Sequence, residues 1–91
     1  MSIIVILPNA LRPLAANNER VFLEAATAGE ALTKLFERYP ELDAKLPDNL
    51  DNPPHGVAVY RNSVDLRKLQ GMATPLQNDD RITIIVPEGH L

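Results

Sequence analysis

The feature that most constrains the fold is a single long helical stripe set among short strand-like runs. Apolar residues recur at helical spacing over residues 27–39, whereas the other apolar runs are short and rich in β-branched residues. A lone amphipathic helix must bury its apolar stripe against another element of the fold. The sequence therefore predicts an α+β fold in which this one main helix packs across one face of a mixed sheet.

Five segments have the composition of β-strands. They are residues 3–7, 20–24, 57–62, 66–69 and 82–86. The first is apolar at every position, which predicts a strand buried on both faces, and the fourth is expected to be a short edge strand. We expect the first strand to be central, paired in a hairpin with the second and lying parallel to the last. This is the β-grasp arrangement, with four to five strands.

Thr27 and Glu30 mark the start of the helix. The Thr27 hydroxyl can accept a hydrogen bond from the Glu30 amide, and the Glu30 carboxylate can reach back to the Thr27 amide. Pro40 ends the helix, and one or two short helical turns can follow before Pro47. The predicted apolar stripe consists of Ala31, Leu32, Leu35, Phe36 and Tyr39.

Length and composition restrict the class of protein. With 91 residues, the chain is expected to form one domain over residues 1–87, followed by a tail at 88–91. The net charge of −3 argues against nucleic acid or an anionic membrane as the main partner. The absence of cysteine excludes a disulfide framework and a cysteine nucleophile. The first apolar run is too short to cross a bilayer and lacks a basic flank, so we expect a cytoplasmic protein.

Residues that carry catalysis or bind metals are sparse. The two histidines, His55 and His90, are far apart in the chain, and no spacing typical of metal ligands joins them. Ser63 has no histidine near it in the sequence, and Asp79-Asp80 is better explained as a turn before a strand. We therefore expect no metal site and no catalytic residue, and a stand-alone enzyme is the least favoured function.

Several segments, taken in their order and spacing, resemble a known family. They are residues 8–12, 26–32, 38–42, 57–62, 69–76 and 80–87. Residues 26–32, for example, read Ala-Thr-Ala-Gly-Glu-Ala-Leu, which is similar to the family's helix start. The chain resembles the MoaD/ThiS family of ubiquitin-like sulfur carriers, and within it the MoaD-like carriers of cysteine-forming and related pathways.

The resemblance implies a carrier rather than an enzyme. In this family the carboxylate of a C-terminal glycine is adenylated by a ubiquitin-activating-type enzyme, which uses ATP, and is then converted to a thiocarboxylate. The thiocarboxylate donates sulfide to a sulfur-acceptor enzyme. By this resemblance the chain holds no permanently bound cofactor, and its expected partners are these two enzymes.

The tail departs from the family pattern. The family ends in two glycines, whereas this chain reads Pro87-Glu88-Gly89-His90-Leu91. Some carriers of the family are made with extra terminal residues that a JAMM-type zinc protease removes. The resemblance thus implies that Gly89 becomes the adenylation and thiocarboxylate site after removal of His90 and Leu91, with Pro87 and Glu88 forming the rest of the tail.

A second departure lies just before the last strand. Asn78-Asp79-Asp80 stands where the family usually has Asp-Gly-Asp. Aspartate tolerates the left-handed backbone conformation that glycine adopts in such turns. We therefore expect this departure to cost the fold little.

Alternation along the third and last strands predicts a docking surface for a partner protein. The residues expected to face outwards are Val57, Val59, Arg61, Thr83 and Ile85, while the alternate residues face the helix. Exposed apolar patches of this kind often mark partner sites. The alternatives are that the surface is covered by the proline-rich loop expected over residues 48–55 or by self-association.

Two functions from different classes stay open on this evidence. The first is a sulfur carrier trimmed to Gly89. The second is a β-grasp interaction module that has lost carrier chemistry and binds a partner enzyme through the predicted docking surface, as a regulatory or scaffolding subunit. Changes at Gly89 should matter only for the first function, whereas Val59→Arg should matter for the second.

Overall fold

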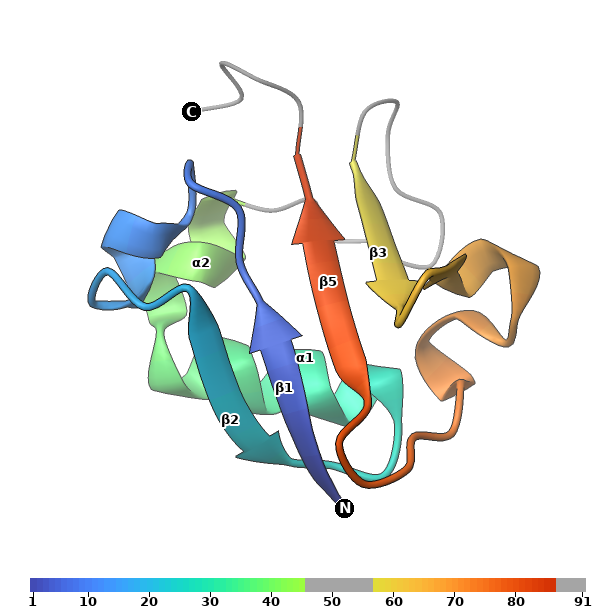
Figure 1. Cartoon of the computed structure of the whole chain (residues 1–91). Helices are drawn as coiled ribbons and strands as arrows, with labels where there is room; N and C mark the ends of the chain where they lie inside the picture. The colour runs from blue at the N-terminus through green and yellow to red at the C-terminus, as the bar shows by residue number, and fades with distance from the viewer. Residues whose placement is uncertain (46–56, 87–91) are drawn as a thin grey trace.

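A five-stranded sheet forms one layer of the molecule, and helix α1 (Ala28–Arg38) crosses one face of it (Figure 1). The computed structural model describes residues 1–45 and 57–86. The strands lie in the order β2-β1-β5-β3-β4. Their bounds are Ser2–Ile6 for β1, Arg20–Glu24 for β2, Ala58–Arg61 for β3, Val64–Asp65 for β4 and Arg81–Ile85 for β5.

The topology confirms the predicted β-grasp arrangement. Strand β1 pairs antiparallel with β2 and parallel with β5, so it lies inside the sheet as expected. Strand β5 pairs antiparallel with β3 on its other side. The chain's first and last strands therefore lie next to each other in the middle of the sheet (Figure 1).

The edge beyond β3 differs from the prediction. The edge strand β4 is Val64–Asp65, whereas the expected strand at 66–69 is replaced by a 3-10 turn over Leu66–Lys68. The Asp65 carboxylate causes the change, because it accepts a hydrogen bond of 2.8 Å from the Arg67 amide and so caps the turn. The other short helices are η1 (Arg12–Ala15), α2 (Pro40–Lys45) and η3 (Gly71–Ala73).

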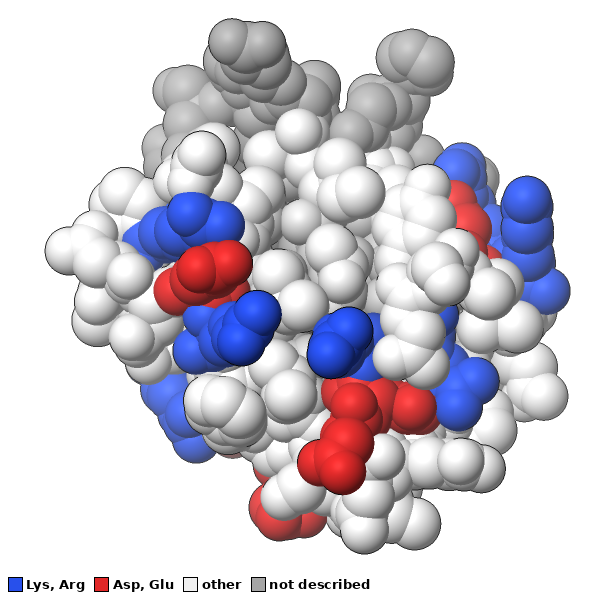
Figure 2. Space-filling model, viewed as in Figure 1, with Lys and Arg blue, Asp and Glu red and all other residues white. Residues whose placement is uncertain are grey.

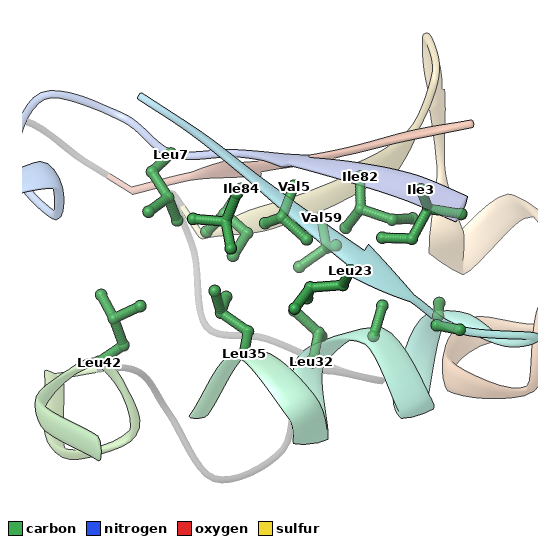
Figure 3. Packing of buried hydrophobic residues seen from close by; sticks show 14 of the residues in the cluster. Ile3, Val5, Leu7, Leu23, Leu32, Leu35, Leu42, Val59, Ile82 and Ile84 are labelled. Atoms are coloured by element: carbon green, nitrogen blue, oxygen red, sulfur yellow. The ribbon is translucent and has the colours of Figure 1, made fainter. Parts of the chain in front are cut away.

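Strand β1 is buried on one face only, which corrects the expectation of burial on both. Ile3 and Val5 are fully buried, whereas Ile4 and Ile6 are partly exposed. The physical reason is that α1 and α2 pack on one side of the sheet, and no described element packs on the other (Figures 1 and 3). The expected loop at 48–55 lies outside the described residues.

Helix α1 begins at Thr27, as predicted, with one difference in the capping. The Thr27 hydroxyl accepts a hydrogen bond of 3.2 Å from the Glu30 amide. The Glu30 carboxylate, however, accepts from the amide of Ala26, at 2.7 Å, and not from that of Thr27. The first contact satisfies an amide that the first helical turn leaves without a partner, and the second ties the residue before the N-cap to the helix.

The core lies between the sheet and the helices. Side chains of β1, β3 and β5 point towards α1 and α2 (Figure 3). The labelled members of this cluster are Ile3, Val5, Leu7, Leu23, Leu32, Leu35, Leu42, Val59, Ile82 and Ile84. Of the predicted helical stripe, Leu32 and Leu35 are buried, and Phe36 is half-buried against the cluster.

A glycine in the first turn of α1 lets η3, which lies between β4 and β5 in the chain, approach the helix closely. A Cβ atom on Gly29 would lie 3.1 Å from the Met72 carbonyl oxygen and 3.2 Å from the Met72 Cβ. The segment that carries Met72 is η3, which packs on α1. The absent side chain therefore allows the segment before β5 to lie directly on the helix.

Candidate functional site

The predicted C-terminal site lies outside the described residues. Gly89, together with the flanking tail residues Pro87, Glu88, His90 and Leu91, is not described, so its role and the domain boundary at 87 stay predictions. The described chain leads up to this site through β5. Because β5 is hydrogen-bonded to β1 on one edge and β3 on the other, the strand that precedes the tail is held on both sides.

Two residues of the predicted docking surface are buried, so that part of the prediction is wrong. Val57 is 3% exposed and Val59 is 2% exposed. Both belong to the core cluster beneath the sheet. Arg61, predicted to lie beside them on the outside, is half-buried and bonded to Asp80.

The register between β3 and β5 explains the error. Val59 lies opposite Ile84, and residues directly opposite in an antiparallel pair share one face of the sheet. Ile84 faces the helix, as predicted, so Val59 must face it too. The alternate residues of β3, Ala58 and Tyr60, are therefore the ones that face outwards.

The predicted inward and outward sides of β5 are confirmed. Ile82 and Ile84 are buried, Thr83 is half-buried, and Ile85 is 44% exposed. Ile85 lies opposite Ala58 and Thr83 lies opposite Tyr60, which joins the two strands into one exposed surface.

The sheet face that is turned away from α1 carries a largely uncharged surface. We call it the outer apolar face, and it consists of Ile4, Ile6, Phe22, Ala58, Tyr60, Thr83 and Ile85. Its most exposed member is Phe22, at 66%. Figure 2 shows uncharged residues across this side of the molecule, with groups of charged side chains between and around them. Apolar surface that no described part of the chain covers is the usual property of a protein-docking site.

Two arginines border the outer apolar face. Arg20 is the cross-strand neighbour of Ile6, and Arg81 is the neighbour of Ile4. Within the described part of the chain, neither arginine forms an ion pair. Glu24, an acid on this face, is already engaged, because its carboxylate lies 3.3 Å from the N-terminal ammonium group and 2.8 Å from the Ser2 hydroxyl. Two unpaired positive charges, Arg20 and Arg81, thus lie beside the face, although the whole chain is acidic.

A buried carboxylate fixes the start of β5. Asp80 accepts hydrogen bonds from the Arg61 side chain at 2.8 Å, from the Gln77 amide at 2.8 Å and from the Asn62 side chain at 3.3 Å. Burial raises the pKa of Asp80, but the hydrogen bonds outweigh burial and leave this pKa below its ordinary value. The carboxylate therefore stays ionised and ties the end of β3 to the beginning of β5.

The turn before β5 has the left-handed backbone conformation that the sequence predicts. Asp79 has a φ of 68°, in the left-handed region, at the position where the resembled family usually has glycine. Its amide donates a hydrogen bond of 2.7 Å to the Ser2 carbonyl, which holds the turn against the start of β1.

The described residues offer no metal centre. Among residues 1–45 and 57–86, no group of three or more histidine, cysteine or acidic side chains could hold a metal ion. His55 and His90 lie outside these ranges. In the same part of the chain, no helix is both long and apolar enough to span a membrane.

Sequence reasoning missed most of the outer apolar face, although one signal for it was available. Arg20-Val21-Phe22-Leu23-Glu24 alternates strictly, so Phe22 lies on the same face as two charged residues and must be exposed. Ile4 and Ile6 gave no such signal, because every residue from 3 to 7 is apolar and the sequence there does not alternate. Only the pairing of β1 with β2 places them beside Phe22.

Comparison with known proteins settles the family. The sequence profile of the ThiS family matches residues 5–89. The chain belongs to the ThiS family. This confirms the resemblance stated above, together with the ubiquitin-like β-grasp fold. Members of this sulfur-carrier family are small protein substrates rather than enzymes, which agrees with the scarcity of catalytic side chains in the sequence.

Individual relatives agree in sequence and in structure. The sulfur carrier protein CysO of Mycobacterium tuberculosis is 28% identical over 87 residues, which span 93% of this chain and 94% of the relative. Its crystal structure superposes with a TM-score of 0.81 at 26% identity, covering 93% of this chain and 98% of that one. Both comparisons cover 93% of this chain.

Two further structures share the fold at lower identity. The CysO protein in the Amycolatopsis orientalis BexX/CysO complex has a TM-score of 0.81 at 24% identity, covering 93% of this chain and 94% of that chain. The small archaeal modifier protein 1 of Methanosarcina acetivorans has a TM-score of 0.80 at 23% identity, covering 97% of this chain and 94% of that chain.

Proposed function

We propose that the chain is a sulfur carrier whose working end is the carboxylate of Gly89, exposed by removal of His90 and Leu91. One observation carries the proposal: the match to the ThiS family extends to Gly89 and leaves the last two residues outside it. The name of the mycobacterial relative, a sulfur carrier, supports the same chemistry.

The proposed chemistry needs only the carboxylate from this chain. A carboxylate oxygen of Gly89 attacks the α-phosphorus of ATP, and pyrophosphate leaves, which gives an acyl adenylate. A sulfide sulfur then attacks the acyl carbon, and AMP leaves as the carbon–sulfur bond forms. A ubiquitin-activating-type partner enzyme supplies ATP and catalyses the first step. The resulting thiocarboxylate passes its sulfur to a sulfur-acceptor enzyme. Glycine suits the site because it has no side chain to block close approach of the partner's active site.

The outer apolar face is the proposed docking site for the adenylating enzyme. It ends at Ile85, directly before Val86 and the tail, so a partner bound there holds the point from which the tail departs. Arg20 and Arg81, unpaired within the described residues, favour a partner surface that is apolar in the centre and acidic at its rim. This surface replaces the predicted one, since Val57 and Val59 are buried.

Removal of His90 and Leu91 is the step that makes the proposal specific to this chain. A JAMM-type zinc protease is the proposed processing partner. If His90 and Leu91 were kept, the terminal carboxylate would belong to Leu91. The side chains of both residues would then hinder its approach to the active site of the adenylating enzyme.

The proposal is tested by comparing three chains with the same adenylating enzyme, ATP and sulfide. The chains are the full-length protein, a chain that ends at Gly89, and a chain that ends at Glu88. We expect pyrophosphate release and a mass increase equal to the exchange of one oxygen for sulfur only in the chain that ends at Gly89. Modification of the full-length chain on Leu91, or no modification of any chain, would overturn the proposal.

The second candidate, an interaction module without carrier chemistry, is favoured by the presence of Glu88 where carriers have a second glycine. It predicts that the adenylating enzyme or another partner binds all three chains equally and modifies none of them.

A further inference from the structure

Strand β2 forms an open edge of the sheet, and hydrogen bonds show which of its backbone groups point outwards. The Leu7 amide donates to the Glu19 carbonyl and the Ala25 amide donates to the Met1 carbonyl, each at 2.9 Å. Because hydrogen-bonded pairs alternate along an antiparallel ladder, Phe22 and Glu24 belong to the pairs that do not bond β1. Their amides and carbonyls therefore point away from the sheet.

Helix α1 places two cations on this edge. The Lys34 ammonium group donates to the Glu24 carbonyl at 2.6 Å, and the Arg38 guanidinium donates to the Phe22 carbonyl at 3.3 Å. Between the strand and the helix lies a groove of about 510 Å³, lined by Leu23, Glu24, Lys34, Glu37 and Arg38. Both carbonyls are thus covered, while the amides of Phe22 and Glu24 have no acceptor among the described residues.

The groove thus presents four hydrogen-bond donors, which are two backbone amides, one ammonium group and one guanidinium. Of the two acids that line it, Glu24 is engaged by the N-terminal ammonium group and the Ser2 hydroxyl, so that Glu37 alone stands against the two cations. We propose that this groove binds an extended acidic segment of a partner protein, which adds to the sheet beside β2. The carboxylates of such a segment would draw Lys34 and Arg38 away from the Glu24 and Phe22 carbonyls. These carbonyls would then accept from the amides of the segment, and its carbonyls would accept from the two free amides.

The spacing of the two cations defines the segment more closely. Lys34 and Arg38 are four residues apart on a helix, which separates them by about 6 Å along its axis. In an extended strand, residues i and i+2 point the same way and lie about 6.6 Å apart. The groove therefore fits two acidic residues separated by one residue.

The same cations exclude the simplest competing occupant, which is β2 of a second copy of this chain. Such pairing would bring Lys34 and Arg38 of one copy next to their counterparts, and like charges across a sheet edge oppose association. The groove also lies on the helix side of β2, whereas the outer apolar face lies on the opposite side. A partner in the groove therefore leaves the proposed docking site for the adenylating enzyme uncovered.

The test uses the full-length chain labelled with ¹⁵N and a capped synthetic peptide in which aspartate alternates with valine. We expect the largest amide shifts at Phe22 and Glu24, and about tenfold weaker binding for the double variant Lys34→Gln/Arg38→Gln. The control variant Arg81→Gln/Lys68→Gln removes the same charge elsewhere and should bind the peptide as the natural chain does. Equal binding of a peptide with asparagine in place of aspartate would overturn the proposal.

Three other results would also overturn it. They are shifts centred on Ile4 and Thr83 of the outer apolar face, no shift at millimolar peptide, and peptide-independent dimers that protect the β2 edge. The peptide comparison and the shift map use the natural chain, so they decide the matter even if the double variant is unstable.

Discussion

A single residue, Asp80, decides where β5 begins and therefore where the tail is delivered. Its carboxylate joins the Arg61 and Asn62 side chains at the end of β3 to the Gln77 amide in the turn before β5. The Asp80 carbonyl also accepts from the Ile4 amide at 2.9 Å, which connects the same residue to β1. Three neighbouring segments thus meet at one residue, two of them through its ionised side chain and the third through its backbone carbonyl.

Replacing Asp80 with asparagine should lower the free energy of unfolding by about 1–3 kcal/mol, because buried hydrogen bonds to a charged group are lost.

The natural chain should also lose stability in acid, because the Asp80 carboxylate becomes protonated. The folded-state pKa of Asp80 is lowered from an unfolded value of about 3.9. Its contribution is therefore complete above about pH 4 and disappears as the pH falls through the lower, folded-state pKa. Urea unfolding of both chains from pH 2 to 7 checks this, and an Asp80→Asn chain with the same acid dependence as the natural chain would contradict it.

Replacing Asp79 with glycine should act in the opposite direction. The φ of 68° at Asp79 is strained for a residue with a Cβ and unstrained for glycine. We expect the free energy of unfolding to rise by up to about 1 kcal/mol, as measured by thermal and urea unfolding. Asp43→Gly is the matched control, because the same substitution inside helix α2 should lower stability by about 0.3 kcal/mol, the difference in helix propensity between the two residues.

At the scale of elements, some features followed from the sequence and others did not. The start of α1 at Thr27 and the inward side of β5 were predicted, because capping residues and alternation are local signals. The inward side of β3 was not, because residues 57–60 are apolar or aromatic on both faces. Which residues of β3 face the helix depends on the register with β5. Arg61 and Asn62 fix that register through their contacts with Asp80, about twenty positions further along the chain.

The same distinction applies to the functional surface. Ile85 was predicted correctly from its own strand. Ile6 and Tyr60 become members of the outer apolar face only because Thr83 lies between them in the assembled sheet.

The capping of α1 gives a prediction at this scale. Thr27→Ala removes the acceptor of the Glu30 amide and should lower the free energy of unfolding by about 1 kcal/mol. Thr27→Ser keeps the acceptor oxygen and should retain most of that stability. Urea unfolding of the two variants measures the difference, and equal losses in both would show that the cap contributes nothing.

At the scale of the whole molecule, the fold has two layers, and no described element covers the second face of the sheet. The net charge of −3 gave no indication of the unpaired arginines beside that face. Net charge is a sum over the surface, whereas docking depends on the few charges that border the contact.

The outer apolar face should be sensitive to charge where other exposed apolar sites are not. Ile85→Arg should weaken binding to the adenylating enzyme by tenfold or more, because it places a charge within the apolar contact, at the end of the face that adjoins the tail. Val64→Arg is the matched control, since Val64 is 42% exposed and Ile85 is 44% exposed, but Val64 lies on edge strand β4 opposite Arg61 and outside the face. Titration calorimetry measures both affinities, and equal losses would contradict the assignment of the face.

The position of β5 between two partner strands has a mechanical consequence. A pull on Val86 along the direction of β5 loads the ladders to β1 and β3 in shear, so their hydrogen bonds must rupture together and not one after another. The folded body can thus bear a pull on the chain beyond Val86 without unravelling.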